Sequence, residues 1–433
     1  MTSAPDDRTR VRTGTRARVA VAVTVLALVA AASAAAVSYR SAAPQSVYGV
    51  PRPTPSTVAV VGLIDAALAL QGIALRTGDE AAWLSVVDPA DERLAQTHRT
   101  RFRVLREMLA ADWVARPLGV PVATGPGGWD VTIVARFCLG VRSCAAARPA
   151  NGPTPAEAFT AVTSWRLDAD GAVLTAETPT SDERSGSSAY APWVAGALVV
   201  SVGPRVVVAA APDLRDRLPD VLAAGERAAS NADSFLPGAH PGRYIVYLAG
   251  REQWRTWFGG GLPEWATAYA PPTSHTHRAV IVNLGGISER GLDSALRHEL
   301  GHVVTMGDVS SAAVPFWMAE GIAEWIDQAH RPATAHPYVG PARRYLRDVG
   351  LPELETLTPG MDDPQWRVSG QYGLAYLAIR YLADSYGAAA VLEFLSARKR
   401  GLPLAESSKA AFAVAWPSVE SDITVYYGTL LAP

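Results

Sequence analysis

The sequence has only two cysteines, no excess of charge of either sign and no internal repeat. Two thiolates cannot supply the four ligands of a cysteine-only zinc site, so sites of that kind are excluded. The formal net charge of −2 carries no basic stripe, which gives no reason to expect a nucleic acid as a partner. With 49% hydrophobic and 18% charged residues, most of the 433-residue chain is expected to fold, into two or three domains.

The two cysteines, Cys138 and Cys144, lie close together in the segment FCLGVRSC. They can close a small disulfide loop if the chain is exported from the cytoplasm. The alternative is a pair of free thiols in a strand-loop region. The choice depends on the compartment, which the N-terminus predicts.

The N-terminus has the pattern of a membrane anchor. Residues 1–18 form a basic segment with five arginines from Arg8 to Arg18, and residues 19–38 form an uncharged apolar run. This run is long enough to cross a bilayer as a helix, and the arginines keep residues 1–18 in the cytoplasm. The alternative is a signal peptide that is cleaved near the small residues 34–36, which would make the protein secreted. Residues 39–56 are rich in Pro, Ser and Ala and predict an extended tether to the extracytoplasmic part.

Residues 57–178 predict a small α+β accessory domain. Helical periodicity extends to about residue 118, and the segments WDVTIVARFCLG and FTAVTSWRLDADGAVLTAET then predict antiparallel strands. Helices followed by a curved sheet resemble an NTF2-like or cystatin-like domain. Such a domain can hold a ligand, form a dimer or act as a spacer.

A polar linker over residues 178–188 precedes a second domain of residues 189–433, again α+β. GALVVSVGPRVVVAAA predicts a β-hairpin, residues 213–235 a helix, and YIVYLAG and RAVIVNLGG two strands. Residues 263–274 are expected to be a loop. Beyond residue 288 the pattern is mainly helical.

Residues 289–306 contain no proline and predict a helix through His298, Glu299 and His302, in the sequence HELGH. Residues four apart share one face of a helix, so the two histidines can bind one zinc ion. Glu299 can then reach a metal-bound water without being a ligand, and can take the proton that zinc makes more acidic. The alternative is a pair of surface histidines on an amphipathic helix.

A third ligand is expected on the next helix. Pro315 suits the first turn of a helix over PFWMAEGIAEWID, where Glu320 and Glu324 lie four apart on one face. The Trp and Ile residues around them indicate that this helix is half buried, and buried carboxylates need partners. The alternative is a solvated helix surface.

HELGH followed by PFWMAEGIAEW resembles the gluzincin zinc metallopeptidases, in particular the peptidase-MA-like proteins, whose second motif has the form W-x-x-E-G-x-A. The resemblance covers about residues 190–430 and is strongest over 294–326. It implies a thermolysin-like catalytic fold, with Glu320 as the third zinc ligand and Glu324 as a hydrogen-bond partner of His298. It also implies an edge strand beside the cleft, and residues 278–286 are expected to be that strand.

Gluzincins usually add a Tyr or His that stabilises the oxyanion. Residues 369–387 predict a helix with Tyr372 and Tyr376 on one face, and Tyr372, near the helix start, is the candidate. The alternative is that both tyrosines pack in a helical core. Four further histidines are expected to be loop residues, since three ligands are already accounted for: His275, His277, His330 and His336.

The sequence therefore predicts a membrane-anchored, extracytoplasmic zinc metallopeptidase whose substrates are peptides or proteins. A second interpretation is a non-catalytic zinc-holding protein that binds or senses at the cell surface, and a closed fourth coordination position would favour it. A third places the function in residues 57–178, and a large apolar pocket there would favour it.

Overall fold

The structure is a computed structural model, and the residues it describes belong to one compact unit. They are residues 56–148, 156–168, 171–182, 187–237, 240, 242–262, 265–274, 277–307 and 314–432. The predicted basic segment, membrane span and nearly all of the tether lie outside the described residues.

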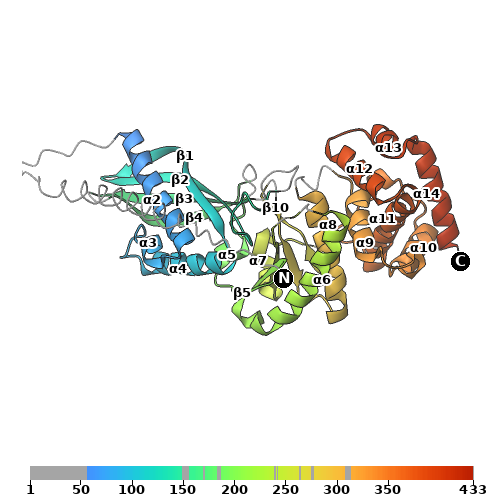
Figure 1. Cartoon of the computed structure of the whole chain (residues 1–433), viewed down its shortest axis with the longest axis horizontal. Helices are drawn as coiled ribbons and strands as arrows, with labels where there is room; N and C mark the ends of the chain where they lie inside the picture. Colours follow the sequence, from blue (N-terminus) through green and yellow to red (C-terminus); the bar gives the residue numbers. More distant parts are fainter. Residues whose placement is uncertain are drawn as a thin grey trace, which may run out of the picture. The chain divides into compact units, whose positions relative to one another are not determined.

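The part of the chain predicted to be the accessory domain, which keeps that name below, consists of helices followed by an antiparallel sheet, in the predicted order (Figure 1). Its helices are α2 (Thr57–Thr77), α3 (Glu80–Leu84) and α4 (Glu92–Glu107). Its strands are β1 (Ala111–Gly125), β2 (Gly128–Cys138), β3 (Glu157–Leu167) and β4 (Ala172–Thr180), which neighbour one another in sequence order. Each of the three helices begins after a Ser or Asp whose side chain accepts a backbone N–H of the first turn, which stabilises the helix start.

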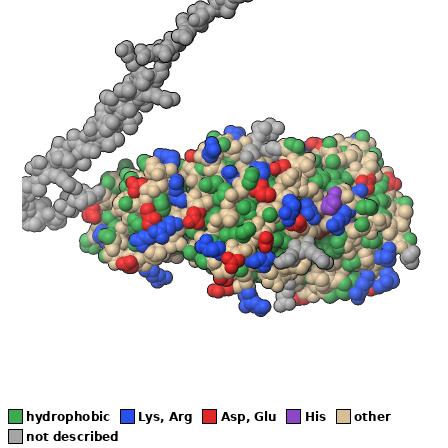
Figure 2. Space-filling view, turned by 60° about the horizontal axis from the view of Figure 1, so that its bottom comes forward, with side chains coloured by type: hydrophobic (Ala, Val, Ile, Leu, Met, Phe, Trp, Pro, Cys, Tyr) green, Lys and Arg blue, Asp and Glu red, His purple; other side chains and the backbone are tan. Residues whose placement is uncertain are grey.

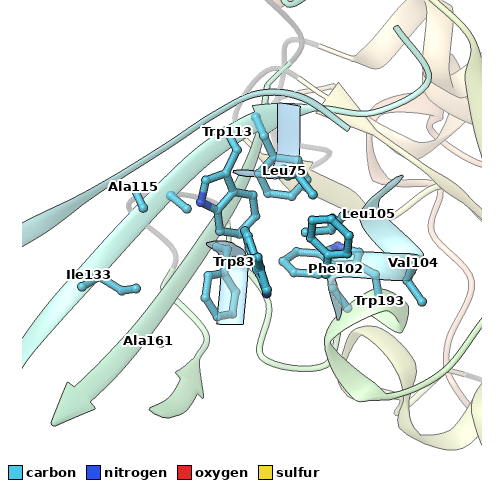
Figure 3. Close-up of a cluster of buried hydrophobic side chains, with 14 of the residues drawn as sticks. Leu75, Trp83, Phe102, Val104, Leu105, Trp113, Ala115, Ile133, Ala161 and Trp193 are labelled. Carbon is cyan, nitrogen blue, oxygen red and sulfur yellow. The ribbon is translucent and has the colours of Figure 1, made fainter. Parts of the chain in front are cut away.

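Aromatic side chains fill the space between these helices and the sheet (Figure 3). The rings of Trp113 and Phe137 lie 4.8 Å apart, and Trp193 meets Phe137 edge-on at 5.3 Å. Trp83 is 1% exposed and packs on Phe102. Such a filled interior argues against placing the function of the chain in an apolar pocket between these elements. The resemblance to NTF2-like domains stays a prediction.

Among the described residues, α2 alone is long and apolar enough to cross a membrane. However, Ile64, Leu68 and Leu75 of α2 are buried in the core of the accessory domain. A Cβ atom at Gly72 would lie 2.6 Å from the carbonyl oxygen of Trp113, so the helix rests directly on β1. These are the contacts of a core helix. The membrane location remains a prediction that rests on residues 19–38.

Residues 189–433, predicted to be a second domain, contain a five-stranded sheet in the order β5-β6-β7-β11-β8, with β8 (Ala268–Tyr269) at one edge. The predicted hairpin is β5 (Val199–Val202) with β6 (Val206–Ala210), and β6 is parallel to β7 (Tyr244–Ala249), which is parallel to β11 (Val280–Asn283). Along β6, Val206 and Val208 belong to the core under α6 (Leu218–Phe235), whereas Val207 and Ala209 belong to the core that includes the accessory domain. Burial of both faces explains the continuous apolar runs of these strands.

The accessory domain and this sheet therefore share one continuous cluster of buried side chains. The loop after β2 reinforces the contact. Cys138 and Cys144 form a disulfide there, with Cα atoms 5.4 Å apart. Within the loop, the carbonyl oxygen of Gly140 accepts a hydrogen bond of 3.0 Å from Nη1 of Arg243, just before β7. The predicted domain boundary near residues 178–188 is not tested by these contacts and stays a prediction.

Beyond residue 288 the described residues are mainly helical, as predicted, and the helix Phe316–Gln328 packs between the helices Glu289–Met306 and Gln365–Tyr386. The helices are α8 (Glu289–Met306), α9 (Phe316–Gln328), α10 (Val339–Asp348), α11 (Gln365–Tyr386), α12 (Ala388–Lys399), α13 (Leu404–Phe412) and α14 (Trp416–Leu431). The remaining short elements include α5 (Pro192–Ala195), α7 (Arg251–Thr256), β9 (Pro272–Ser274) and β10 (His277–Arg278). The predicted mixed α+β class is confirmed.

The edge strand of the sheet differs from the prediction. β11, within the expected segment 278–286, lies inside the sheet, and the edge is β8 (Ala268–Tyr269), antiparallel to β11. β8 falls in residues 263–274, which were expected to be a loop. A strand of two residues is too short to show alternation of apolar and polar side chains, so the sequence pattern could not reveal it.

Basic and acidic side chains are both scattered over the face in view in Figure 2. No stripe of one sign is visible there.

Candidate metal centre

Helix α8 positions the first motif between the sheet and the cleft. The hydroxyl of Ser288 accepts a backbone N–H of the first turn and fixes the start of the helix. Leu296 and Leu300 are fully buried in the core beneath the sheet. Because these leucines face the sheet, His298 and His302 lie on the side that lines the cleft.

Helix α9 approaches α8 closely enough to bring the second motif opposite the first. A Cβ atom at Gly301 would lie 3.3 Å from Cα of Ala323, so even an alanine at residue 301 would press on the backbone of α9. Asp327, 1% exposed, accepts hydrogen bonds from Arg297 and from the hydroxyl of Ser294 on α8. These contacts fix the spacing of the two helices.

The three predicted ligands come together at one point. Nε2 of His298 lies 3.1 Å from Nε2 of His302, and Oε2 of Glu320 lies 3.1 and 3.2 Å from these two nitrogens. A tetrahedral zinc ion with bonds of about 2.0–2.1 Å separates its ligand atoms by about 3.3 Å. The donor separations therefore suit a metal ion of this size. Two imidazoles and one carboxylate are also the donor set of a catalytic zinc site.

The electrostatics of the cluster favour a cation. Burial alone lowers the pKa of His298, yet Glu320 and Glu324 raise it well above its usual value. Burial alone raises the pKa of Glu320, yet His302 and His298 hold it below its usual range. Both shifts stabilise positive charge beside the carboxylates. The residues present therefore fit a divalent metal ion.

Glu324 lies between two histidines, His298 and His336. Its Oε1 lies 3.3 Å from Nδ1 of His298, and its Oε2 lies 3.0 Å from Nε2 of His336. Although burial raises the pKa of Glu324, hydrogen bonds from these two histidines lower it to about 2. The ionised carboxylate faces Nδ1 of His298, while Nε2 of the same ring faces the donor cluster.

Glu299 is poised beside the cluster without belonging to it. Its side chain is 6% exposed, and its Oε2 has no hydrogen-bond partner among the described residues. Burial raises its pKa, which strengthens it as a base near neutral pH. The cleft beside it has a volume of about 370 Å³ and reaches Ala268 on the edge strand β8. A buried carboxylate oxygen without a partner is costly, and a reacting molecule in the cleft would supply one.

The two tyrosines of α11 have different surroundings. The ring of Tyr372 lies 6.2 Å from that of His298, and the side chain lines the cleft. Burial raises the pKa of Tyr372 well above its usual value, so the hydroxyl keeps its proton. Tyr376 is fully buried and stacks on His336. The candidate Tyr372 thus lies at the cleft, and the core alternative describes Tyr376.

The other histidines that the structure describes do not join the donor cluster. His330 is exposed, and His275 lies outside the described residues. His277 is buried with its Nε2 3.4 Å from Glu157 of the accessory domain. His336, expected to be a loop residue, is instead bonded to Glu324. No local pattern could reveal this contact, because it forms only when the turn after α9 folds back onto the helix.

Solved structures that are similar to this chain include two of low identity. Yeast LTA4 hydrolase is 14% identical with a TM-score of 0.37, over 62% of this chain and 43% of that one. A mutant M1 zinc metallopeptidase from Deinococcus radiodurans is 15% identical with a TM-score of 0.32, over 73% of this chain and 63% of that one. This chain thus spans less than two thirds of the length of either. No protein-family model and no curated protein matches the sequence.

Proposed function

We propose that this chain is a zinc-dependent metallopeptidase with a thermolysin-like catalytic domain that hydrolyses peptide bonds in peptides or proteins. The observation that carries the proposal is the meeting of His298, His302 and Glu320 with an unpaired Glu299 beside them in an open cleft. We further propose that residues 19–38 anchor the protein in the cell membrane, with the catalytic domain outside.

His298, His302 and Glu320 would hold the ion, which when bound supplies a Lewis acid and makes water more acidic. Glu299 takes a proton from the attacking water on its free Oε2. It then passes that proton to the nitrogen of the leaving amine. The raised pKa of Glu299 suits both transfers, because a group accepts and releases protons most effectively when its pKa is close to the working pH.

Two further elements would serve the substrate. The hydroxyl of Tyr372 keeps its proton and can donate a hydrogen bond to the carbonyl oxygen as negative charge develops there. The edge strand β8 borders the cleft, and its backbone can pair with an extended peptide as an added strand. An accessible cleft at Glu299 favours an enzyme over a zinc-holding binding protein, in which the fourth metal position would be closed.

The test uses the full-length protein purified in detergent, with zinc analysis and a library of quenched fluorescent peptides. The wild type is expected to hold one zinc ion per chain and to cleave a subset of the peptides. Glu299→Gln is expected to keep the zinc and to lose at least about a hundredfold in kcat, because it removes the general base. The matched control is Glu393→Gln on the surface of α12, which is expected to keep full activity.

Hydrolysis that survives Glu299→Gln would overturn the mechanism. Bound zinc without hydrolysis of any peptide by the wild type would support the non-catalytic binding protein instead. For the location, the protein is expected in the membrane fraction after alkaline carbonate extraction of cells. Its recovery from the medium would show that the N-terminal segment is a cleaved signal.

A further inference from the structure

His336 is the one histidine outside the donor cluster that is tied to it by hydrogen bonds within the described residues. It follows the short turn Ala333–Ala335 after α9, and it is 4% exposed. Its Nε2 lies 3.0 Å from Oε2 of Glu324, whose other oxygen faces Nδ1 of His298. A chain of two hydrogen bonds therefore connects the buried His336 to a metal-ligand candidate.

The hydrogen bonds of His336 fix its protonation pattern. The backbone N–H of Tyr338 points at Nδ1 of His336 at 3.1 Å, so Nδ1 is the acceptor. A neutral imidazole with an accepting Nδ1 carries its proton on Nε2. That proton is donated to Glu324. Both oxygens of Glu324 are then occupied by N–H donors, one from His298 and one from His336.

The imidazole of His336 is also held rigidly. Its ring stacks on the ring of Tyr376 with centroids 3.9 Å apart and planes inclined by 20°. The ring of Tyr338 meets it edge-on at 5.3 Å. An imidazole packed in this way cannot rotate, so the fold sets the direction of its Nε2–H. That N–H points at the carboxylate of Glu324.

We propose that His336 is a positioning residue that holds Glu324, and through it His298, in the orientation that binds the metal. The proposal rests on the proposed function in that His298 is taken as a metal ligand. Its consequence is specific: Nε2 of residue 336 must donate a hydrogen bond, whereas the stacking ring by itself is not sufficient. Partners of ligand histidines in metal sites change the metal affinity by about 10- to 100-fold when removed.

The test compares zinc affinity in three variants by competition with a chromophoric chelator. His336→Gln places an amide N–H near the position of Nε2 and is expected to bind zinc within about threefold of the wild type. His336→Asn keeps an acceptor for Tyr338 but cannot reach Glu324, and is expected to bind zinc about tenfold more weakly. His330→Leu, at an exposed position, is the control and is expected to bind like the wild type.

Two further readouts separate positioning from packing. In the zinc-loaded protein, proton NMR is expected to show a slowly exchanging Nδ1–H signal of His298 in the wild type and His336→Gln, and a faster-exchanging one in His336→Asn. In turnover, kcat is expected to fall in His336→Asn. KM is expected to stay the same, because a buried residue does not touch the substrate.

Equal zinc affinity in the wild type and His336→Asn would overturn the proposal. So would an equal loss in His336→Gln and His336→Asn, because the ring and not the donor would then matter. If the wild type binds zinc but cleaves no peptide, the proposed function fails while the affinity and NMR comparisons still decide the role of His336.

Discussion

The glycine that follows the third ligand gives a sharp test of the helix packing. Gly321 lies in the middle of α9, where helices normally disfavour glycine. A Cβ atom there would lie 2.7 Å from Cγ1 of Ile379 and 2.8 Å from the carbonyl carbon of Ala375. Because the second of these atoms is backbone of α11, side-chain rotation cannot relieve the contact. Gly321→Ala must therefore push α9 and α11 apart.

The expected magnitude follows from two opposing effects. Overpacking of a close contact costs about 1–3 kcal/mol, and the clash with backbone places this site toward the upper end. Alanine in a helix interior is favoured over glycine by about 1 kcal/mol. The net expectation is that Gly321→Ala lowers the free energy of unfolding by about 2 kcal/mol.

The matched control is Gly428→Ala on α14, in the same helical part of the chain. Gly428 is exposed, and a Cβ atom there would have no neighbour within 4 Å. This substitution is expected to stabilise the protein by about 0.5–1 kcal/mol through helix propensity alone. Urea unfolding followed by far-ultraviolet circular dichroism measures both variants. If Gly321→Ala were as stable as Gly428→Ala, the close contact between α9 and α11 would be refuted.

Two further predictions concern charge and metal. Burial raises the pKa of Glu157 to about 7. The stabilising contribution of its proton to folding is therefore fully present below about pH 4.5, the ordinary pKa, and is lost as the pH rises through 7. Glu157→Gln is expected to be more stable than the wild type by about 3 kcal/mol at pH 8 and nearly equal at pH 4, and a difference independent of pH in urea unfolding would contradict this. Zinc added to the metal-free protein is expected to stabilise it by about 4 kcal/mol at a thousandfold excess over Kd, and calorimetry should show no such rise for His302→Ala. An equal rise in both proteins would refute the ligand assignment.

The parts of the site that the sequence predicted are those that depend on local geometry. Four-residue spacing on one helix places His298 beside His302 wherever that helix packs, and a proline at residue 315 marks the start of the next helix. The segment that connects the two helices is long enough for α9 to fold back and bring Glu320 beside the two histidines. These relations survive any detail of the tertiary fold.

The parts that the sequence did not predict depend on contacts between distant segments. The edge strand β8 spans two residues and exists only because β11 lies beside it. His336 is defined by a turn that folds back onto α9, which no periodicity records. The core that the accessory domain shares with the five-stranded sheet also has no sequence signature. A polar linker has the same composition whether or not the segments on either side of it pack together.

This shared core limits where the polypeptide chain can be truncated. Trp193 packs on Phe137 and Phe159 of the accessory domain, and Ile245 of β7 lies against the disulfide loop at Gly140. A fragment that begins at residue 189 would keep the metal site but expose these apolar side chains to water, which creates a surface prone to aggregation. Residues 57–180 are therefore expected to act as a built-in folding partner of the metal-binding domain, synthesised first and needed in any soluble version of the protein.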